Sequence, residues 1–235
     1  RTERLNPQTG NDSMKFNYNG ISQFSSVRNT QASSTLDKLG FKSAGTNLNL
    51  RYQNNSILMD SIFGIRYNLS ETDPFLPEKT EKEMSLYQND AALGLAFLTN
   101  DVYHDVKFTN LTLDNQTEFL NQLTGFDFKY YDKVDAITTN ENVKQIGNRV
   151  TVNVDREHNT SFASVIYTVN VPANSQLYVN VAGIDFSNDV QTDVDITVNN
   201  FTERYTTNNV FPFFNAGYFS QSQTVSIRFT FPNNS

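Results

Sequence analysis

The histidines are the first residues to consider for chemistry, and this 235-residue chain has only two. His104 lies in DVYHD, Asp101–Asp105, and His158 lies in REHNT. A histidine between acidic residues can bind a metal or transfer a proton. It can equally be a loop histidine beside solvated carboxylates, which is the interpretation we favour because no second histidine is near in sequence. The sequence therefore assigns no catalytic residue.

Four aspartates form the densest group of oxygen ligands, in DFSNDVQTDVD: Asp185, Asp189, Asp193 and Asp195. Such side chains suit Ca²⁺, but the spacing and the terminal Glu of an EF-hand are missing. The last two also match the Asp-x-Asp that holds a metal and a sugar-nucleotide phosphate in some glycosyltransferases. In a strand, both would share one face while Val194 points to the core. An amphipathic edge strand is the simpler interpretation, and a metal site is the alternative.

Aromatic side chains gather in FPFFNAGYF, Phe211–Phe219, which holds five of them in nine residues. Sugar-binding β-sandwiches stack aromatic rings on sugars at loop ends. Phe211, Phe213, Phe214 and Tyr218 are therefore the ligand-binding candidates. The simpler interpretation, which we favour, is that this loop plugs the end of a sandwich core.

Composition excludes several classes of function. The chain has no cysteine, so it has neither a disulfide framework nor a thiolate metal site. Its net charge of -7 and its lack of a Lys/Arg stripe argue against nucleic acid as a partner. Neither a Gly-rich phosphate loop nor a nucleophile elbow is present, so no cofactor is expected. No apolar run approaches the roughly 18 residues of a membrane span.

The most hydrophobic stretch organises the first half of the chain. We expect a helix over Ser56–Phe63, a turn at Gly64 and a strand over Ile65–Leu69, paired with a second strand over Ser85–Tyr87. The apolar run Ala91–Leu98 follows. This stretch is expected to nucleate the core of an N-terminal domain of mixed α+β structure, residues 1–128.

Two more helices are expected in this domain. Apolar residues recur with helical spacing over Thr30–Leu39, and Gly40 is a candidate to end that helix. Asp114–Leu123 is the clearest helix, with Asp114 as its N-cap and Gly125 at its end.

From Arg149 onward, the pattern changes to short alternating segments rich in Val, Ile, Thr, Tyr and Phe. Turn clusters separate them, and no helical period is visible. This pattern predicts an antiparallel, jelly-roll-like β-sandwich as a second domain, residues 129–235. The fold class expected for the whole chain is therefore α+β, predominantly β.

Five segments of the first half resemble the bacterial YfhO family of multi-span membrane proteins. They are NGISQFSS (Asn19–Ser26), LDKLG (Leu36–Gly40), LMDSIFGIRYNLS (Leu58–Ser70), LYQNDAALGLAF (Leu86–Phe97) and FLNQLTG (Phe119–Gly125). The resemblance covers residues 1–125, and the second half matches only weakly. Arg66 stands where the family usually has Lys, and Leu93-Gly94-Leu95 replaces Leu-Pro-Leu.

The resemblance implies a role in the cell envelope. YfhO-like proteins resemble GT-C glycosyltransferases, which use a lipid-linked sugar donor, and members are implicated in glycosylating lipoteichoic acid. The chain would then be an accessory, acceptor-positioning domain on the extracellular face of a Gram-positive bacterial membrane. Its partners would be the transmembrane portion of the same polypeptide and a cell-envelope glycopolymer. The family's catalytic acid matches no residue here, so none is assigned.

Two other functions remain open from the residues alone. The β-rich second half and the aromatic cluster also fit a cell-surface carbohydrate-binding or adhesion module. A free hydrolase with carboxylates brought together only in space is the third hypothesis. Nothing in the sequence singles out such a pair of carboxylates.

Overall fold

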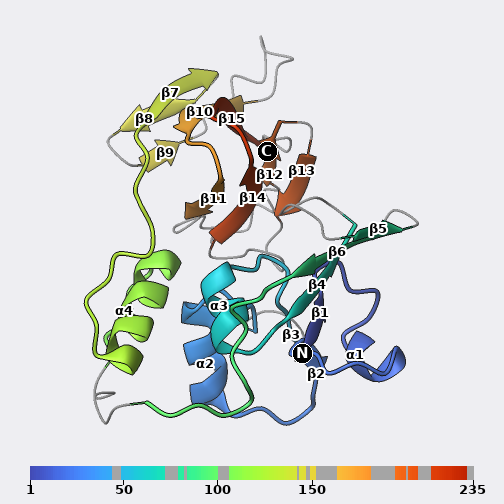
Figure 1. Ribbon diagram of the computed structural model, residues 1–235. Helices are drawn as coiled ribbons and strands as arrows, with labels where there is room; N and C mark the ends of the chain where they lie inside the picture. The colour runs from blue at the N-terminus through green and yellow to red at the C-terminus, as the bar shows by residue number, and fades with distance from the viewer. Residues whose placement is uncertain are drawn as a thin grey trace. The chain divides into compact units, whose positions relative to one another are not determined.

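The computed structural model divides the chain into two compact units, which are described separately (Figure 1). Unit 1 comprises Arg1–Asp132, Gln176–Ala182 and Phe211–Tyr218, and unit 2 comprises Lys133–Ser175, Gly183–Val210 and Phe219–Ser235. The structure describes residues 1–43, 49–71, 79–81, 84–99, 106–141, 143–146, 149–151, 163–180, 194–199, 201–205 and 213–231. The chain first leaves unit 1 after Asp132, and two later segments return to it.

A four-stranded sheet lies in unit 1, with the strand order β1-β4-β6-β5. Its strands are β1 (Thr2–Arg4), β4 (Tyr67–Ser70), β5 (Lys79–Glu81) and β6 (Met84–Gln88). The antiparallel pairing of β4 with β6 is the one expected from the sequence. β1 pairs with β4 in parallel, although its segment reads as polar loop.

Four helices accompany this sheet: α1 (Asp12–Lys15), α2 (Thr30–Lys38), α3 (Ile57–Ile62) and α4 (Thr112–Thr124). α2 and α3 begin at side-chain caps, since Asn29 Oδ1 accepts from Ala32 N at 3.0 Å and Ser56 Oγ accepts from Met59 N at 3.2 Å. The three longer helices are those predicted from the sequence. The N-cap of α4 is Leu111, however, and Asp114 lies in its first turn.

Two small two-stranded sheets also lie in the described part of unit 1. One joins β2 (Gln23–Phe24) to β3 (Asn49–Leu50) in an antiparallel pairing. The other joins β11 (Ser175–Asn180) to β14 (Phe213–Phe219), and most of its residues belong to the returning segments. The ribbon between β11 and β14 therefore brings chain from the second half of the sequence into unit 1.

The hydrophobic core of unit 1 is built from fully buried side chains of several elements: Leu39, Phe41, Tyr52, Met59 and Ile65. The rings of Phe41 and Tyr52 stack with their centroids 4.4 Å apart. The chain has no tryptophan, so Phe and Tyr rings supply the aromatic packing of this core.

Met59 and Ile65 of the stretch expected to nucleate this core do lie in it, but the apolar run Ala91–Leu98 at the end of that stretch does not. The run has no regular secondary structure, and its large side chains are exposed. Hydropathy ranks segments by composition alone. The core of unit 1 is instead formed by residues of α2, α3 and the loops that flank these helices.

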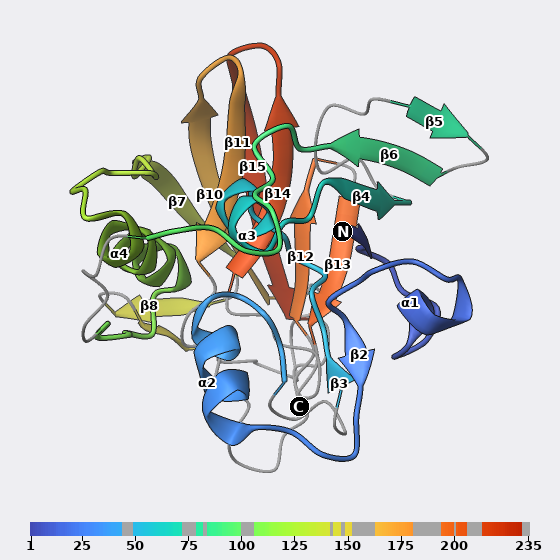
Figure 2. The same ribbon diagram turned by 60° about the horizontal axis from the view of Figure 1, so that its bottom comes forward.

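Unit 2 contains a five-stranded antiparallel sheet with the order β13-β12-β15-β10-β7 (Figure 2). Its strands are β7 (Ala136–Glu141), β10 (Ala163–Val171), β12 (Val194–Val198), β13 (Phe201–Tyr205) and β15 (Gln223–Phe231). A separate hairpin joins β8 (Lys144–Ile146) to β9 (Arg149–Thr151). The predominance of antiparallel β structure is confirmed. Within the described part of the chain, no helix is both long and apolar enough to cross a membrane.

Candidate functional site

The aspartates proposed as metal ligands do not form a metal site in the described part of the chain. Asp185, Asp189 and Asp193 lie outside the described residues, as do both histidines. Asp195 lies on β12 and forms a two-bond ion pair with Arg204 of β13, at 2.6 and 2.7 Å. Across the described ranges, no three His, Cys, Asp or Glu residues come together as metal ligands.

The aromatic cluster near residue 213 lies mostly in the core of unit 1. Phe213 and Phe214 are both 0% exposed, so neither ring has a free face on which a sugar could stack. Phe213 packs so tightly on Gly40 that a Cβ on this glycine would approach its ring to 2.3 Å. Tyr218 is half-buried, and Phe211 lies outside the described residues. The segment is a strand of unit 1 rather than a plug in a sandwich.

Exposed aromatic rings lie elsewhere, in the segment that follows α4. Phe126 is 59% exposed and Phe128 is 54% exposed. Their ring centroids are 5.1 Å apart with an interplanar angle of 34°, and Tyr130 meets Phe128 edge-on at 6.1 Å. We call Phe126, Phe128 and Tyr130 the aromatic ladder. Two neighbouring rings of similar tilt present a continuous apolar surface to solvent.

Backbone hydrogen bonds fix the ladder in place. Gly125 ends α4 in the left-handed conformation at φ 71°, which turns the chain sharply out of the helix. The side chain of Asn121 then forms two hydrogen bonds to the backbone of Phe128. Its Nδ2 donates to the Phe128 carbonyl and its Oδ1 accepts from the Phe128 N–H, both at 3.1 Å. The rings are thus held by their main chain, and their faces remain available.

The ladder suits the face of a sugar ring better than it suits a charged group. Aromatic rings carry a large apolar area, and both Phe side chains lack a polar atom. Two charged residues that follow them neutralise each other, since Lys129 pairs with Asp132 at 2.7 Å. Apolar stacking requires no net positive charge, so it is compatible with the acidic balance of the chain.

A small groove lies beside the start of α2, with a volume of about 190 Å³. This is below the roughly 300–1,000 Å³ of sites for drug-sized ligands, so the groove fits at most one small unit. Its lining is mixed: Gln23, Ser25, Val27, Arg28, Asn29, Ala32, Ser33, Leu36 and Leu50. Arg28 supplies a guanidinium, of which Nη1 already donates to the Ser43 carbonyl at 2.8 Å.

A buried carboxylate, Asp60, lies at the centre of a polar network in unit 1. It accepts hydrogen bonds from Tyr52 Oη at 2.9 Å, Asn55 Nδ2 at 2.8 Å and Asn68 Nδ2 at 2.7 Å. We call these four residues the amide network. Burial raises the pKa of Asp60 to about 7, because the loss of hydration outweighs the three neutral donors, and the charge of Glu3 adds to the rise.

The amide network continues into polar residues that join distant segments. Asn215 Nδ2 donates to Asn55 Oδ1 at 3.1 Å, which ties β14 to the loop before α3. Ser56 Oγ donates at 2.9 Å to Gln116 Oε1, and Gln116 Nε2 donates at 2.8 Å to the Leu39 carbonyl. Asp60 is only 1% exposed, so its titration acts on the fold rather than on a ligand.

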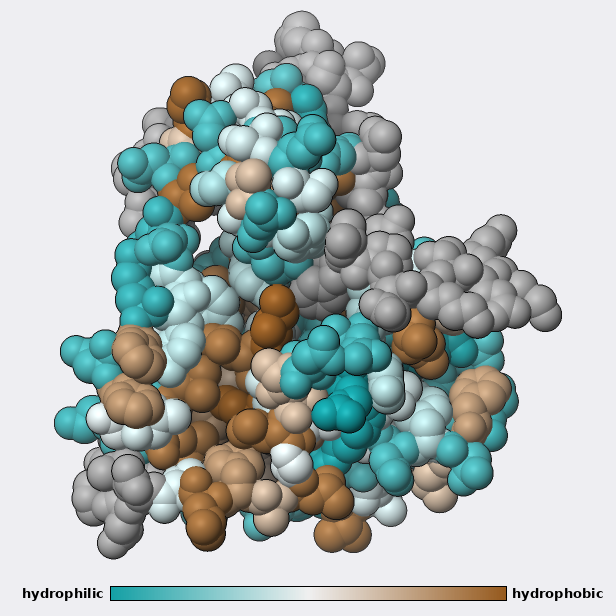
Figure 3. Space-filling view, in the orientation of Figure 1, coloured by the Kyte–Doolittle hydropathy of each residue, from teal (hydrophilic) through white to brown (hydrophobic). Residues whose placement is uncertain are grey.

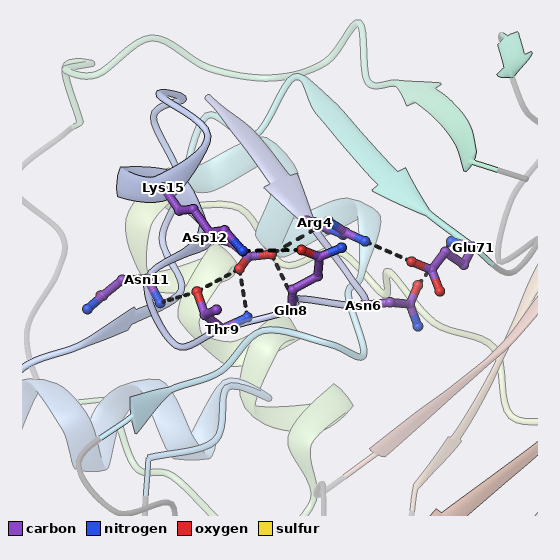
Figure 4. Close-up of polar contacts among 8 residues, drawn as sticks. All are labelled: Arg4, Asn6, Gln8, Thr9, Asn11, Asp12, Lys15 and Glu71. Atoms are coloured by element: carbon purple, nitrogen blue, oxygen red, sulfur yellow. Dashed lines mark hydrogen bonds and ion pairs between the residues drawn. The ribbon is translucent and has the colours of Figure 1, made fainter. Parts of the chain in front are cut away.

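A second carboxylate network surrounds Asp12 (Figure 4). Asp12 accepts from Gln8 N at 2.8 Å and from both N and Oγ1 of Thr9, at 2.7 and 2.8 Å. Arg4 approaches Asp12 at 3.8 Å and also pairs with Glu71 at 2.8 Å. These contacts close the loop before α1 onto the sheet, which is a structural role.

The ladder was missed because its sequence, FDFKYYDK, has mixed charge and no long apolar period. A signal was nevertheless present. Phe126, Phe128 and Tyr130 alternate with Asp127 and Lys129, directly after the glycine that ends a helix. Alternation in a segment with charged neighbours puts the rings on one side of an extended chain.

Comparison with known proteins gave one finding. A family model described as "Bacterial membrane protein YfhO" matches residues 1–235, which is the whole chain. The curated proteins gave no match, and the solved structures gave none either.

Proposed function

The chain belongs to the YfhO family of bacterial membrane proteins, and from this premise we propose that it is the extracellular part of a membrane-bound glycosyltransferase. In this role, it holds an acceptor glycopolymer such as lipoteichoic acid for a reaction carried out at the membrane. The observation that carries the proposal is the family match over all 235 residues. The aromatic ladder supplies a surface with the right chemistry for a sugar-bearing polymer.

Stacking of sugars on aromatic rings allows the acidic chain to bind an anionic polymer despite their mutual repulsion. An acidic chain with a net charge of -7 repels an anionic polymer on average. Phe126 and Phe128 can contact the apolar faces of the sugars without approaching a phosphate. The groove beside α2, with Arg28 in its lining, is a second place where one charged unit could be held.

The role proposed is positioning rather than catalysis. The buried carboxylates Glu3, Asp12 and Asp60 are at most 2% exposed, so a bulky substrate cannot reach them. Asp195 is occupied by Arg204. In this proposal the catalytic residues belong to the membrane-embedded portion of the protein, and family membership favours this over a free adhesion module.

The proposal is tested by calorimetric titration of the 235-residue chain with two polymers. One is a poly(glycerol phosphate) that bears hexose substituents, and the other is the same polymer without sugar. We expect the sugar-bearing polymer to bind more tightly. Replacing Phe126 and Phe128 together by Ala should weaken its binding by about tenfold or more, as truncation of exposed anchoring aromatics commonly does.

Two variants serve as controls in this titration. Phe97→Ala removes an exposed ring of unit 1 outside the ladder and should leave polymer binding unchanged. Arg28→Gln tests whether the groove beside α2 contributes to polymer binding. Arg66→Gln is its control, because it removes the same charge at an exposed position outside the groove. Equal binding by the wild type and the ladder variant would refute the ladder as the contact. Sugar transfer by the chain alone would refute the accessory role.

A further inference from the structure

An exposed apolar segment, Ala91–Thr99, is the most unusual surface of unit 1. Leu95 is 85% exposed and Leu98 is 101% exposed, while Leu93 and Phe97 are each more than two-fifths exposed. The segment contains no charged residue. Figure 3 shows hydrophobic side chains gathered over α3 and between α3 and α4, with hydrophilic residues on either side. Side chains of this size in water are costly unless something covers them.

The start of this segment is held firmly at the end of α3. Leu93 N donates to the Ser61 carbonyl at 2.9 Å, and Asn89 N donates to the Arg66 carbonyl at 2.8 Å. Gly64 makes the close approach possible, since a Cβ there would lie 2.7 Å from the Leu93 carbonyl oxygen. Its positive φ of 64° also favours glycine. The fold therefore fixes the backbone while it leaves the apolar side chains outside.

We infer that Ala91–Thr99 is a membrane-contacting segment that inserts its leucines and phenylalanine into the interface of a lipid bilayer. The chain belongs to a family of membrane proteins, so a bilayer is the apolar phase available to it. A stretch of nine residues is far shorter than the roughly 20 of a spanning helix, so the contact is with the interface, about 5–10 Å deep.

Charge distinguishes the bilayer from other occupants. The segment is neutral, whereas the chain as a whole carries -7, so two copies repel each other as they approach. The same acidity opposes an anionic headgroup surface, and it leaves a zwitterionic interface as the favoured one. In the sequence, Asp90 precedes the segment and Asp101 follows it, so the nearest charged residues lie outside the apolar stretch.

The absence of tryptophan from the chain gives a direct test. Leu98→Trp and Leu95→Trp each introduce a single tryptophan in the segment, and Met14→Trp introduces one at a site of similar exposure on α1. With phosphatidylcholine vesicles, we expect the emission of the two segment variants to shift to shorter wavelength and to be quenched by brominated lipid. The emission of Met14→Trp should not change.

A charge inserted in the segment should abolish the contact. Leu95→Asp with Leu98→Asp should reduce partitioning to the same vesicles by at least about tenfold, and Met14→Asp should leave it unchanged. Because all three side chains are exposed, the substitutions should leave the thermal unfolding midpoint unaltered. Identical emission with and without vesicles would overturn the inference. So would sedimentation of a dimer that depends on Leu98.

This inference rests on family membership and is independent of glycopolymer binding. Phe126→Ala with Phe128→Ala should lose polymer binding and keep vesicle binding. The Asp variants of the segment should show the opposite pattern. Loss of both activities in either variant would contradict the separation of the two surfaces.

Discussion

Asp60 and Asp12 are two buried aspartates of unit 1 that accept the same number of close hydrogen bonds and yet differ in acidity. Their exposures are 1% and 2%. Asp60 has a pKa raised to about 7, chiefly because burial removes its hydration. Burial also acts on Asp12, but hydrogen bonds from Gln8 and Thr9, with the charge of Arg4, outweigh it and lower the pKa.

The difference lies in the donors. Asp60 is contacted only by neutral side chains, which lie five to eight residues away in sequence, and a neighbouring acid, Glu3, opposes its charge. Asp12 is contacted mostly by backbone N–H groups of its own loop, and it has a cation within 3.8 Å. Backbone N–H groups and a cation therefore favour the charged form of Asp12, whereas neutral side chains and a neighbouring acid leave burial as the dominant effect on Asp60.

The largest expected effect is the loss of protein stability when each aspartate is replaced by Ala. Asp60→Ala leaves the donors of Tyr52, Asn55 and Asn68 buried without an acceptor, which should lower the free energy of unfolding by about 3 kcal/mol or more. Asp12→Ala should cost only about 1–2 kcal/mol, as loss of a capping side chain does. Urea unfolding followed by circular dichroism measures both changes. Equal losses would show that the two networks do not differ in this way.

The next effect is the pH dependence of stability, with opposite signs at the two sites. The pKa of Asp60 is higher in the folded state than its ordinary 3.8, so its contribution to the free energy of unfolding decreases as pH rises from 3.8 to about 7. The slope is at most about 1.4 kcal/mol per pH unit, and the contribution is constant at higher pH. The lowered pKa of Asp12 gives stability above its ordinary value of 3.8 that is lost as pH falls through the folded-state pKa.

Matched variants isolate these contributions. Asp60→Asn should remove the decline towards neutral pH, and Asp12→Asn should remove part of the loss in acid. Burial also raises the pKa of Glu3, which gives a slope of the same sign as that of Asp60. The difference between the wild type and Asp60→Asn in urea unfolding over a pH series cancels that slope. An unchanged profile in Asp60→Asn would contradict the raised pKa.

The smallest effect concerns the cation. Arg4→Gln should raise the pKa of Asp12 towards its ordinary value and lower the free energy of unfolding by about 0.5–1 kcal/mol, because the Arg4–Asp12 pair is long, at 3.8 Å, and the second partner of Arg4, Glu71, is exposed. The pKa of Asp60 should stay the same. Carbon-13 NMR of the aspartate carboxyls reports both values. Arg66→Gln, which removes an exposed charge, is the control, and a matching shift of the Asp12 pKa in that variant would indicate a general charge effect instead.

Elements with strong local signals were predictable from sequence. The apolar residues after Ser56 and the turn at Gly64 predicted α3 and the entry into β4, although Ser56, expected as the first helical residue, is the N-cap. β1 was missed because its residues are polar and its pairing partner, β4, lies more than sixty residues away. The apolar run Ala91–Leu98 was misassigned to the core because hydropathy does not report which side of a segment faces solvent.

The aromatic ladder and the segment around Phe213 also differ in whether a local sequence signal indicated their role. The ladder has a local signal in the alternation of Phe126, Phe128 and Tyr130, which could have been found with the helix end at Gly125. The aromatic segment around Phe213 was expected to fill a sandwich core, but nothing local indicated that Phe213 packs in unit 1, because it enters that unit from the far end of the chain. Asn215, two residues further along, bonds to Asn55 across 160 residues.

By itself, the sequence determined the acidic, cysteine-free composition, the main helices, the alternating strands of unit 2 and the membership of a bacterial membrane protein family. These follow from patterns that neighbouring residues create together. Tertiary structure alone decided which aromatics are buried, which aspartate has a raised pKa and which apolar segment is left exposed. The physical reason is that burial and pKa depend on everything that packs around a side chain in the folded chain, which the neighbouring residues in sequence do not determine by themselves.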